Sequence, residues 1–221
     1  MLTAGRRSLA LKLFDIGAIK FGAFRLKLHD KNPDAPLSPI YVDFRILRSF
    51  PDVMDSAVEV CKDLIDGLQF DVLADVPTAA TPIVAVLSHR TRIPMISPRS
   101  QEKKHGTKRP IDGMFREGQV AVLVDDLITL ADSKLAAISI LEENGVTVHD
   151  VVVLLDREQG GIEELKKRRY ACHIAFGLKE LLKLYLDSDK ISQQQYERTV
   201  AYLEGSTTQV GCRGSPELDT V

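Results

Sequence analysis

The sequence predicts an α/β fold, with a mainly parallel central sheet, helices on both faces and a small N-terminal cap. From residue 70 onward, short apolar runs typical of buried strands alternate with segments of helical periodicity. Such alternation favours right-handed crossovers between parallel strands. The 221 residues, 44% of them hydrophobic, suffice for the core of one domain. We expect that domain at 1–204, with the cap at about 1–45 and a disordered tail at 205–221.

The N-terminal cap is expected to combine a helix with a hairpin. Residues 8–24 have helix-spaced apolar positions interrupted by two glycines, and 24–28 could pair as a strand. Prolines and Asp/Asn residues predict a loop at 29–38, followed by a strand at 40–44. The segment 51–68 starts at a proline and has the period of an amphipathic helix, so it should pack against the sheet.

The rest of the chain is predicted as alternating strands and helices. Strands are expected at 70–74, 94–96, 120–124, 148–155 and 172–176, and helices at 79–89, 133–144, 162–169, 178–186 and 191–203. The segment between the second and third of these strands is a long basic loop. Long loops in compact domains are often lids or binding loops.

Charge and composition exclude several classes of function. A net charge of −2 offers no general field for nucleic acid, so a nucleic-acid partner is not expected. No apolar run approaches the roughly 18 residues that indicate a membrane span, and the N-terminus lacks the apolar region of a signal peptide. We therefore expect a cytoplasmic protein without a membrane partner. Three widely separated cysteines argue against a disulfide framework or a zinc site.

The segment 120–134, VAVLVDDLITLADSK, predicts a sugar-phosphate site. It runs from an apolar strand into Asp125 and Asp126, a polar turn and a helix start. Parallel sheets bind ligands beyond the carboxyl ends of their strands, and a helix N-terminus attracts phosphate. Adjacent carboxylates repel each other, so they usually need a cation or a pair of hydroxyl donors. Magnesium or a ribose diol would serve; the alternative is that both carboxylates simply cap the next turn.

Three other segments could bind ligands at the same edge. The basic loop 99–109 suits a polyphosphate leaving group, or it is a solvated loop. Arg157, in LLDREQGG at 154–161, could fork onto a carboxylate or a planar base, or form an ordinary ion pair. The turn from Asp75 to Thr78 follows a buried strand and precedes a helix, so it forms a second turn at this edge, or merely starts that helix.

These segments resemble one family, the orotate phosphoribosyltransferases, including the transferase half of uridine-monophosphate synthases. The resemblance covers roughly Leu11 to Leu203, and LDREQGG is its most specific part. The matching segments are LFDIGAIKFG (13–22), SPIYVDFR (38–45), IPM (93–95), KHGTKR (104–109), VLVDDLIT (122–129) and LLDREQGG (154–161). The resemblance implies the type I phosphoribosyltransferase fold.

The implied reaction transfers ribose 5-phosphate from phosphoribosyl pyrophosphate to N1 of orotate, giving orotidine monophosphate and pyrophosphate. The resemblance also implies Mg²⁺ as cofactor, held mainly by substrate phosphates without a direct protein ligand. It implies a homodimer, because the family's lid loop reaches into the neighbouring subunit's site. Phosphoribosyl pyrophosphate and orotate are thus the expected small-molecule partners.

The resemblance assigns roles by position. The implied catalytic residues are Lys103, His105, Asp125 and Asp126, with Lys103 as the main catalytic lysine and the acidic pair on the ribose hydroxyls. The implied substrate-binding residues are Arg99 in the lid, Thr129, Ala131, Asp132 and Ser133 at the 5-phosphate, Asp75 and Thr78 at the pyrophosphate, Lys27 near base and ribose, and Arg157 on orotate. Lid closure would exclude water from the reacting centre.

The chain departs from the family pattern where phosphates are expected. Ala131 and Asp75 stand where the family has glycine, Asp132 replaces a small or hydroxyl residue, and Ser100 replaces a basic one. The family's Lys-Ser-Gly element is Lys27-Leu28-His29 here. These departures leave open a second hypothesis, a catalytically impaired relative that binds a nucleotide or acts as a regulator. Transfer to a different base is a third.

Overall fold

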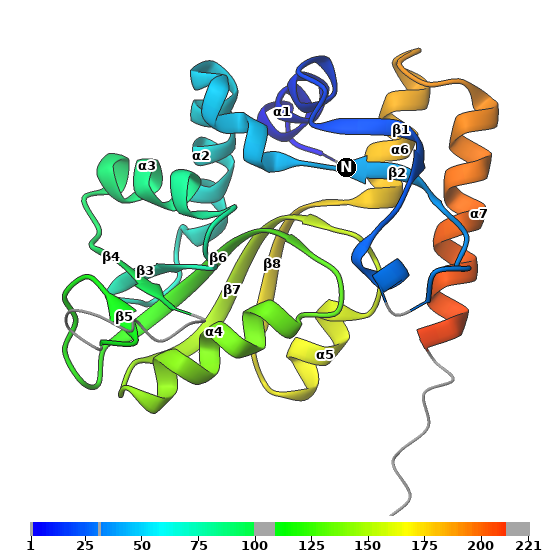
Figure 1. Cartoon of the computed structure of the whole chain (residues 1–221). Coiled ribbons are helices and arrows are strands. Elements are labelled where there is room, and N and C mark those ends of the chain that lie inside the picture. The colour runs from blue at the N-terminus through cyan, green and yellow to red at the C-terminus, as the bar shows by residue number, and fades with distance from the viewer. Residues whose placement is uncertain (1, 31, 100–108, 211–221) are drawn as a thin grey trace, which may run out of the picture.

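The central sheet has six strands in the order β5-β4-β3-β6-β7-β8 (Figure 1). The computed structural model describes residues 2–30, 32–99 and 109–210, without the side chains of 27–28 and 206–210. The strands are β3 (Val72–Asp75), β4 (Met95–Pro98), β5 (Ile111–Asp112), β6 (Val120–Ile128), β7 (Thr147–Asp156) and β8 (Ala171–Gly177). Only β5 pairs antiparallel, with β4. The predicted α/β fold with a mainly parallel sheet is confirmed.

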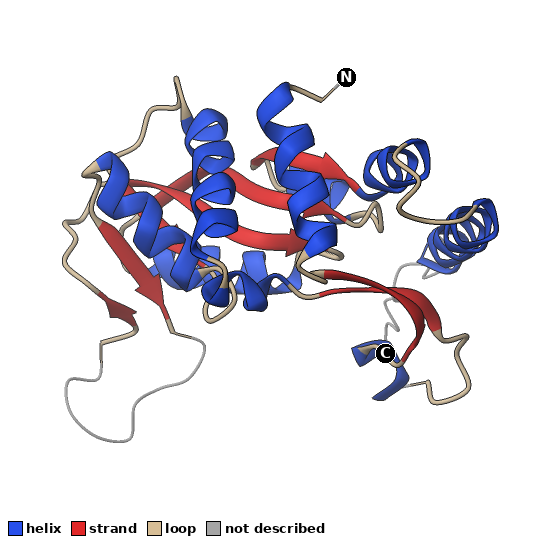
Figure 2. Ribbon diagram, turned by 90° about the horizontal axis from the view of Figure 1, so that it is seen from above, coloured by secondary structure: helices blue, strands red, loops and turns tan. Residues whose placement is uncertain are grey.

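Helices cover both faces of this sheet (Figures 1 and 2). On one side lie α2 (Pro51–Ile65) and α3 (Thr81–Thr91); on the other lie α4 (Asp132–Glu143) and α5 (Gly161–Lys167). Successive residues of a strand point to opposite faces of the sheet. In β7, Val152 packs in the layer of α2, and Val153 packs in the layer of α4. Strands buried on both faces explain the continuous apolar runs in the sequence.

The N-terminal cap consists of α1 (Ala4–Asp15) and an antiparallel hairpin of β1 (Ile19–Phe24) and β2 (Ser38–Val42). The hairpin is confirmed, but the helix predicted through residue 24 and the strand predicted at 24–28 are wrong. Gly17 has φ of 72°, a left-handed conformation that ends α1 and turns the chain into β1. The residues 27–30 form a 3₁₀ turn, and so do 44–49.

The last elements are α6 (Leu178–Asp187) and α7 (Gln193–Val210), and α7 packs against β2 of the cap. Helix α7 continues past Gly205, where the sequence predicted the start of the tail; residues 211–221 lie outside the described part. Its packed face, at Tyr196, Val200 and Leu203, anchors the part of the helix that was predicted at 191–203. Within the described residues, no helix is long and apolar enough to cross a membrane.

Strand β6 extends further than predicted, to Ile128 instead of residue 124. It keeps pairing with β7, and Ile128 stands opposite Asp156. The acidic pair therefore lies near the carboxyl end of strand β6 and not in the following loop. This placement gives Asp125 and Asp126 the rigid backbone of a sheet.

Candidate active site

The acidic pair is held by its own backbone and by a lysine. Asp125 is 4% exposed and Asp126 is half-buried. The Asp126 N–H donates to Asp125 Oδ1 at 2.8 Å, and the Leu127 N–H donates to Asp126 Oδ1 at 2.8 Å. Lys134 Nζ, from α4, lies 2.5 Å from Asp125 Oδ2. The two carboxylates are thus fixed at the carboxyl edge of the sheet.

The electrostatics of this pair favour protonation. Burial and repulsion from Asp125 raise the pKa of Asp126 to about 7. Burial also raises the pKa of Asp125, against the opposing charge of Lys134. Because both values lie above those of the unfolded chain, the stabilisation is present at acidic pH and is lost as pH rises through about 7. Hydroxyl donors or a cation would offset the cost of the ionised pair.

The turn after β6 has the backbone of an anion site. Ala131 has φ of 68° and forms the start of α4, where no side chain caps the helix. Thr129 is half-buried, and Asp132 and Ser133 are exposed on the first turn. Uncapped N–H groups at a helix N-terminus bind phosphate. The left-handed conformation at Ala131 costs on the order of 1 kcal/mol, as is usual for a residue with a Cβ.

The segment LDREQGG packs directly against that turn. The Arg157 N–H donates to the Ile128 carbonyl at 3.0 Å. Gly161 approaches the turn so closely that a Cβ there would lie 2.5 Å from the Thr129 carbonyl oxygen and 2.6 Å from Ile128 Cγ1. Gly160 has φ of 94°. The two glycines therefore allow LDREQGG to pack against the turn that follows β6.

The Arg157 side chain is a buried cation with unused donors. It is 7% exposed, and its Nε and Nη2 atoms have no hydrogen-bond partner among the described residues. Burial lowers the pKa of Arg157, and Tyr202 of α7 is the group that opposes this shift. A buried guanidinium normally pairs with a carboxylate or phosphate. Its free fork is suited to a planar anion.

The second predicted turn carries another buried acid. Asp75 is 0% exposed, and the Thr81 hydroxyl donates to its Oδ2 atom, whereas Oδ1 has no partner among the described residues. Thr78 is exposed. Asp75 ends β3, beside Val124 of β6, so this turn lies next to the acidic pair at the same edge. The placement predicted for this turn agrees with the structure.

The remaining predicted residues are only partly described. Arg99 forms a bidentate pair with Asp112, with Nε 2.5 Å from Oδ2, so in this conformation it is bound to the β5 strand. Lys103 and His105 lie outside the described residues. Lys27 begins the 3₁₀ turn, and the buried His29 two residues later contacts the Leu26 carbonyl at 3.0 Å and the Ala35 carbonyl at 3.2 Å. His29 therefore has a structural role in this loop.

Several known proteins are similar to this chain in both sequence and fold. The bifunctional enzyme PyrF/PyrE of Nostoc sp. is 34% identical over 188 residues, covering 85% of this chain and 38% of that enzyme. The orotate phosphoribosyltransferase of Pyrobaculum aerophilum is 35% identical over 193 residues, covering 87% of this chain and 96% of that protein. The chain belongs to the orotate phosphoribosyltransferase family.

The structural comparison agrees with this family. The UMP synthase of Leishmania donovani matches with a TM-score of 0.81 at 32% identity, over 92% of this chain and 43% of that chain. The chain thus spans about two fifths of the length of these bifunctional relatives. No family model matches the sequence.

Two residues of the site were not predicted from the sequence. Lys134 pairs with Asp125, and Thr81 binds Asp75. A signal for Lys134 was present, because it stands at helical spacing before Ala137, Ile138 and Leu141, the buried face of α4. A lysine on an apolar face needs a buried partner. Thr81 offered no such signal, since threonine is common near helix starts.

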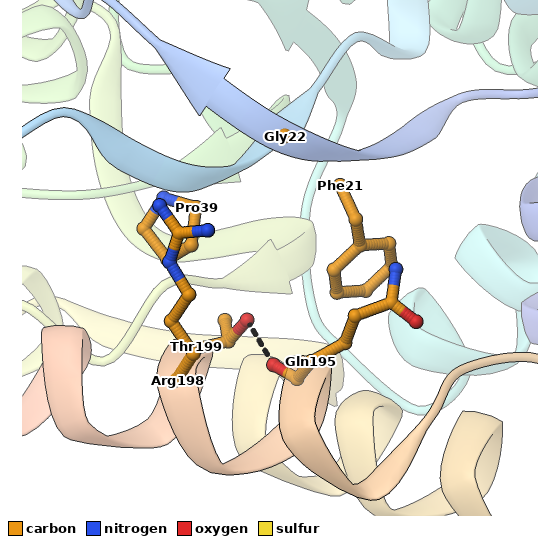
Figure 3. A pocket seen from close by; sticks show the side chains of 6 residues that line it. All are labelled: Phe21, Gly22, Pro39, Gln195, Arg198 and Thr199. Atoms are coloured by element: carbon orange, nitrogen blue, oxygen red, sulfur yellow. Dashed lines mark hydrogen bonds between the residues drawn. The ribbon is translucent and has the colours of Figure 1, made fainter.

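A separate small pocket lies between the hairpin and α7. It has a volume of about 140 Å³ and is lined by Phe21, Gly22, Pro39, Gln195, Arg198 and Thr199 (Figure 3). The Thr199 hydroxyl donates to the Gln195 carbonyl at 2.7 Å. None of the predicted site residues that the structure describes lines this pocket, and small-molecule sites usually measure ≈ 300 Å³ or more. The pocket therefore adds nothing to the candidate site.

Proposed function

We propose that this chain transfers ribose 5-phosphate from phosphoribosyl pyrophosphate to N1 of orotate. The observation that carries the proposal is the contact between the two motif segments, in which Gly161 packs on Thr129 and Arg157 is bonded to Ile128. This contact puts an acidic pair, an uncapped helix start and a free buried guanidinium at one edge of the sheet. Membership of the family supplies the reaction that such a combination serves.

The sugar phosphate is proposed to occupy the β6–α4 turn. Asp125 and Asp126 accept hydrogen bonds from the two ribose hydroxyls, which offsets the cost of ionising a buried pair. The 5-phosphate binds the N–H groups at the start of α4, with Thr129, Ala131, Asp132 and Ser133 forming the turn. Asp75 and Thr78 lie at the pyrophosphate turn, next to this pair.

The base is proposed to bind Arg157. The Nε and Nη2 donors match the spacing of a carboxylate, and orotate carries one. With its carboxylate bound, the base faces C1 of the ribose through N1. The N1–C1 bond then forms as the C1–oxygen bond to pyrophosphate breaks. The bonding electrons leave with the pyrophosphate, and the N1 proton of orotate passes to a pyrophosphate oxygen or to water. Lys27 is proposed to lie near the base and ribose.

The departing pyrophosphate needs positive charge. Arg99, Lys103 and His105 are proposed to supply it from the loop, across the interface of a homodimer. For Arg99 this requires release from Asp112. Mg²⁺ would stabilise the negative charge on the leaving group.

The residues present are compatible with that cation. Within the described residues, no group of three or more His, Cys, Asp or Glu side chains is placed to hold a metal ion. Mg²⁺ commonly takes only one or two carboxylates and completes its shell with substrate phosphates and water. Asp125 and Asp126 are proposed to bind the ribose hydroxyls, so the ion would be held mainly by the substrate phosphates and water, without a direct protein ligand.

The proposed reaction is tested by following the ultraviolet absorbance of orotate. Purified protein with phosphoribosyl pyrophosphate and magnesium is expected to consume orotate, and Lys103→Ala is expected to lose most of that turnover. A general acid or electrostatic group typically contributes ~10²–10⁴-fold. If the parent protein shows no turnover above Lys103→Ala, the enzyme proposal is wrong and the binding or regulatory alternative stands.

The two departures in the phosphate turn have separable effects. Ala131→Gly is expected to raise the free energy of unfolding by about 1 kcal/mol, because it removes the left-handed strain at φ of 68°. Asp132→Ser removes an exposed carboxylate near the phosphate and is expected to tighten phosphoribosyl pyrophosphate binding by about 1 kcal/mol, near fivefold. Denaturant titration and calorimetry measure the two effects. Unchanged affinity in Asp132→Ser would mean that the phosphate binds elsewhere.

A further inference from the structure

We propose that Lys134 is a positioning residue: its ammonium group holds Asp125 in place and keeps the acidic pair charged for the ribose hydroxyls. The proposal rests on the proposed function, since it concerns the same substrate. It also makes a claim about the protein without substrate, which can be tested separately.

The geometry of Lys134 is that of a dedicated partner. Its side chain is 5% exposed, as is that of Asp125, and Nζ lies 2.5 Å from Asp125 Oδ2. The same ammonium donates to the Leu127 carbonyl and to Ser133 Oγ at 3.4 Å. All three donors are thus used at the end of β6 and the start of α4. Lys134 joins the ribose-binding strand to the phosphate turn.

Neither the apolar packing nor the helix dipole at position 134 favours a lysine. Lys134 occupies the buried face of α4, and it lies in the first turn, where the helix dipole disfavours a cation. Moving an ammonium into such a place is costly unless a charge compensates it. The compensating charge is Asp125, one of the two acids proposed to bind the ribose.

The pair of acids needs such a cation to stay ionised. Burial raises both pKa values, and the charge of Lys134 opposes the rise at Asp125 and Asp126. Other ionisable groups near Lys134 are Cys172 on β8 and, through that thiol, Asp156 on β7. An ionised carboxylate is only an acceptor, so the pair binds the ribose hydroxyls best when neither carboxyl group carries a proton. Loss of the ammonium should therefore shift substrate binding to higher pH.

The first test measures the carboxyls without substrate. Carbon-13 NMR titration of labelled aspartates is expected to show Asp126 titrating about one pH unit or more higher in Lys134→Met than in the parent. Lys134→Arg keeps the charge and should titrate like the parent. As a matched control, Lys62→Met removes an exposed lysine of α2 and should change nothing. An unchanged titration in Lys134→Met overturns the inference.

The second test is a double-mutant cycle on phosphoribosyl pyrophosphate affinity, followed by calorimetry at several pH values. Lys134→Met is expected to lose at least tenfold in affinity at pH 7 and to recover most of it near pH 9. In the Asp125→Asn background, Lys134→Met should cost little more, because its effect passes through Asp125. This double variant removes both buried charges, so it remains informative if the single variant fails to fold.

The outcomes separate the two proposals. Additive losses that do not vary with pH would show that Lys134 acts on the phosphate directly or only on folding, and would overturn its positioning role. A parent protein that binds no phosphoribosyl pyrophosphate would overturn the proposed function. The NMR titration would still decide whether Lys134 controls the acidic pair.

Discussion

Replacing Arg157 by methionine is expected to weaken orotate binding by about 30-fold to 4000-fold. Truncating one partner of a buried, hydrogen-bonded charge pair typically costs 2–5 kcal/mol, which corresponds to this range. The Nε and Nη2 donors have no other acceptor among the described residues, so the ligand's carboxylate would lose its only fork at this position. Calorimetry with orotate in the presence of a ribose-phosphate ligand measures the loss.

The same substitution should stabilise the protein without ligand. Arg157 is 7% exposed and two of its donors have no partner among the described residues, so replacing it by methionine removes a desolvation cost. A higher melting temperature together with lost orotate binding would identify a residue kept for its ligand. Arg90→Met, which removes an exposed pair with Asp55, should change neither property. Equal loss of stability and binding would instead assign Arg157 a structural role.

Substitution by lysine tests whether the fork matters or only the charge. Arg157→Lys retains the positive charge but loses the two parallel donors of the guanidinium. We expect it to restore little of the affinity lost in Arg157→Met. Full recovery would mean that the site recognises a point charge and not a planar carboxylate.

The sequence carried most of the information about the fold, because buried strands and amphipathic helices leave periodic patterns. It failed in the cap, where Gly17 ends α1 early and the apolar positions that follow belong to β1. Apolar residues spaced for a helix and those of a short strand are hard to separate over so few positions. The end of β6 was also missed, since pairing with β7 is a long-range effect that carries Asp125 and Asp126 into the strand.

The site was predicted as a set of separate segments, and the structure supplies their contacts. The motif at Arg157 could be found from the sequence, but its burial without a hydrogen-bonding acceptor could not. The family pattern has glycine where Ala131 stands, and in the structure Ala131 has a left-handed conformation with φ of 68°. The pair of Lys134 with Asp125 joins residues of different elements, and only the three-dimensional arrangement reveals it.

Gly161→Ala is expected to damage stability and activity together, because there is no room for its Cβ. The methyl group would meet the Thr129 carbonyl oxygen at 2.5 Å and Ile128 Cγ1 at 2.6 Å. Overpacking of this kind typically costs 1–3 kcal/mol, or ~2–12 °C in melting temperature for a domain of this size. The turn that must give way is the one proposed to hold the 5-phosphate. A displacement of about 1 Å there can lower kcat/KM by ~10²-fold.

Two other glycines separate crowding from backbone strain in this experiment. Gly160 has φ of 94° but open space around it. Gly160→Ala should therefore lower the free energy of unfolding by only on the order of 1 kcal/mol and leave the turn in place. Gly5 in α1 has neither constraint, and Gly5→Ala should be neutral or slightly stabilising. Melting curves and steady-state kinetics of the three variants give the comparison. If Gly161→Ala resembles Gly160→Ala in both measurements, the close packing of LDREQGG against Thr129 does not shape the phosphate turn.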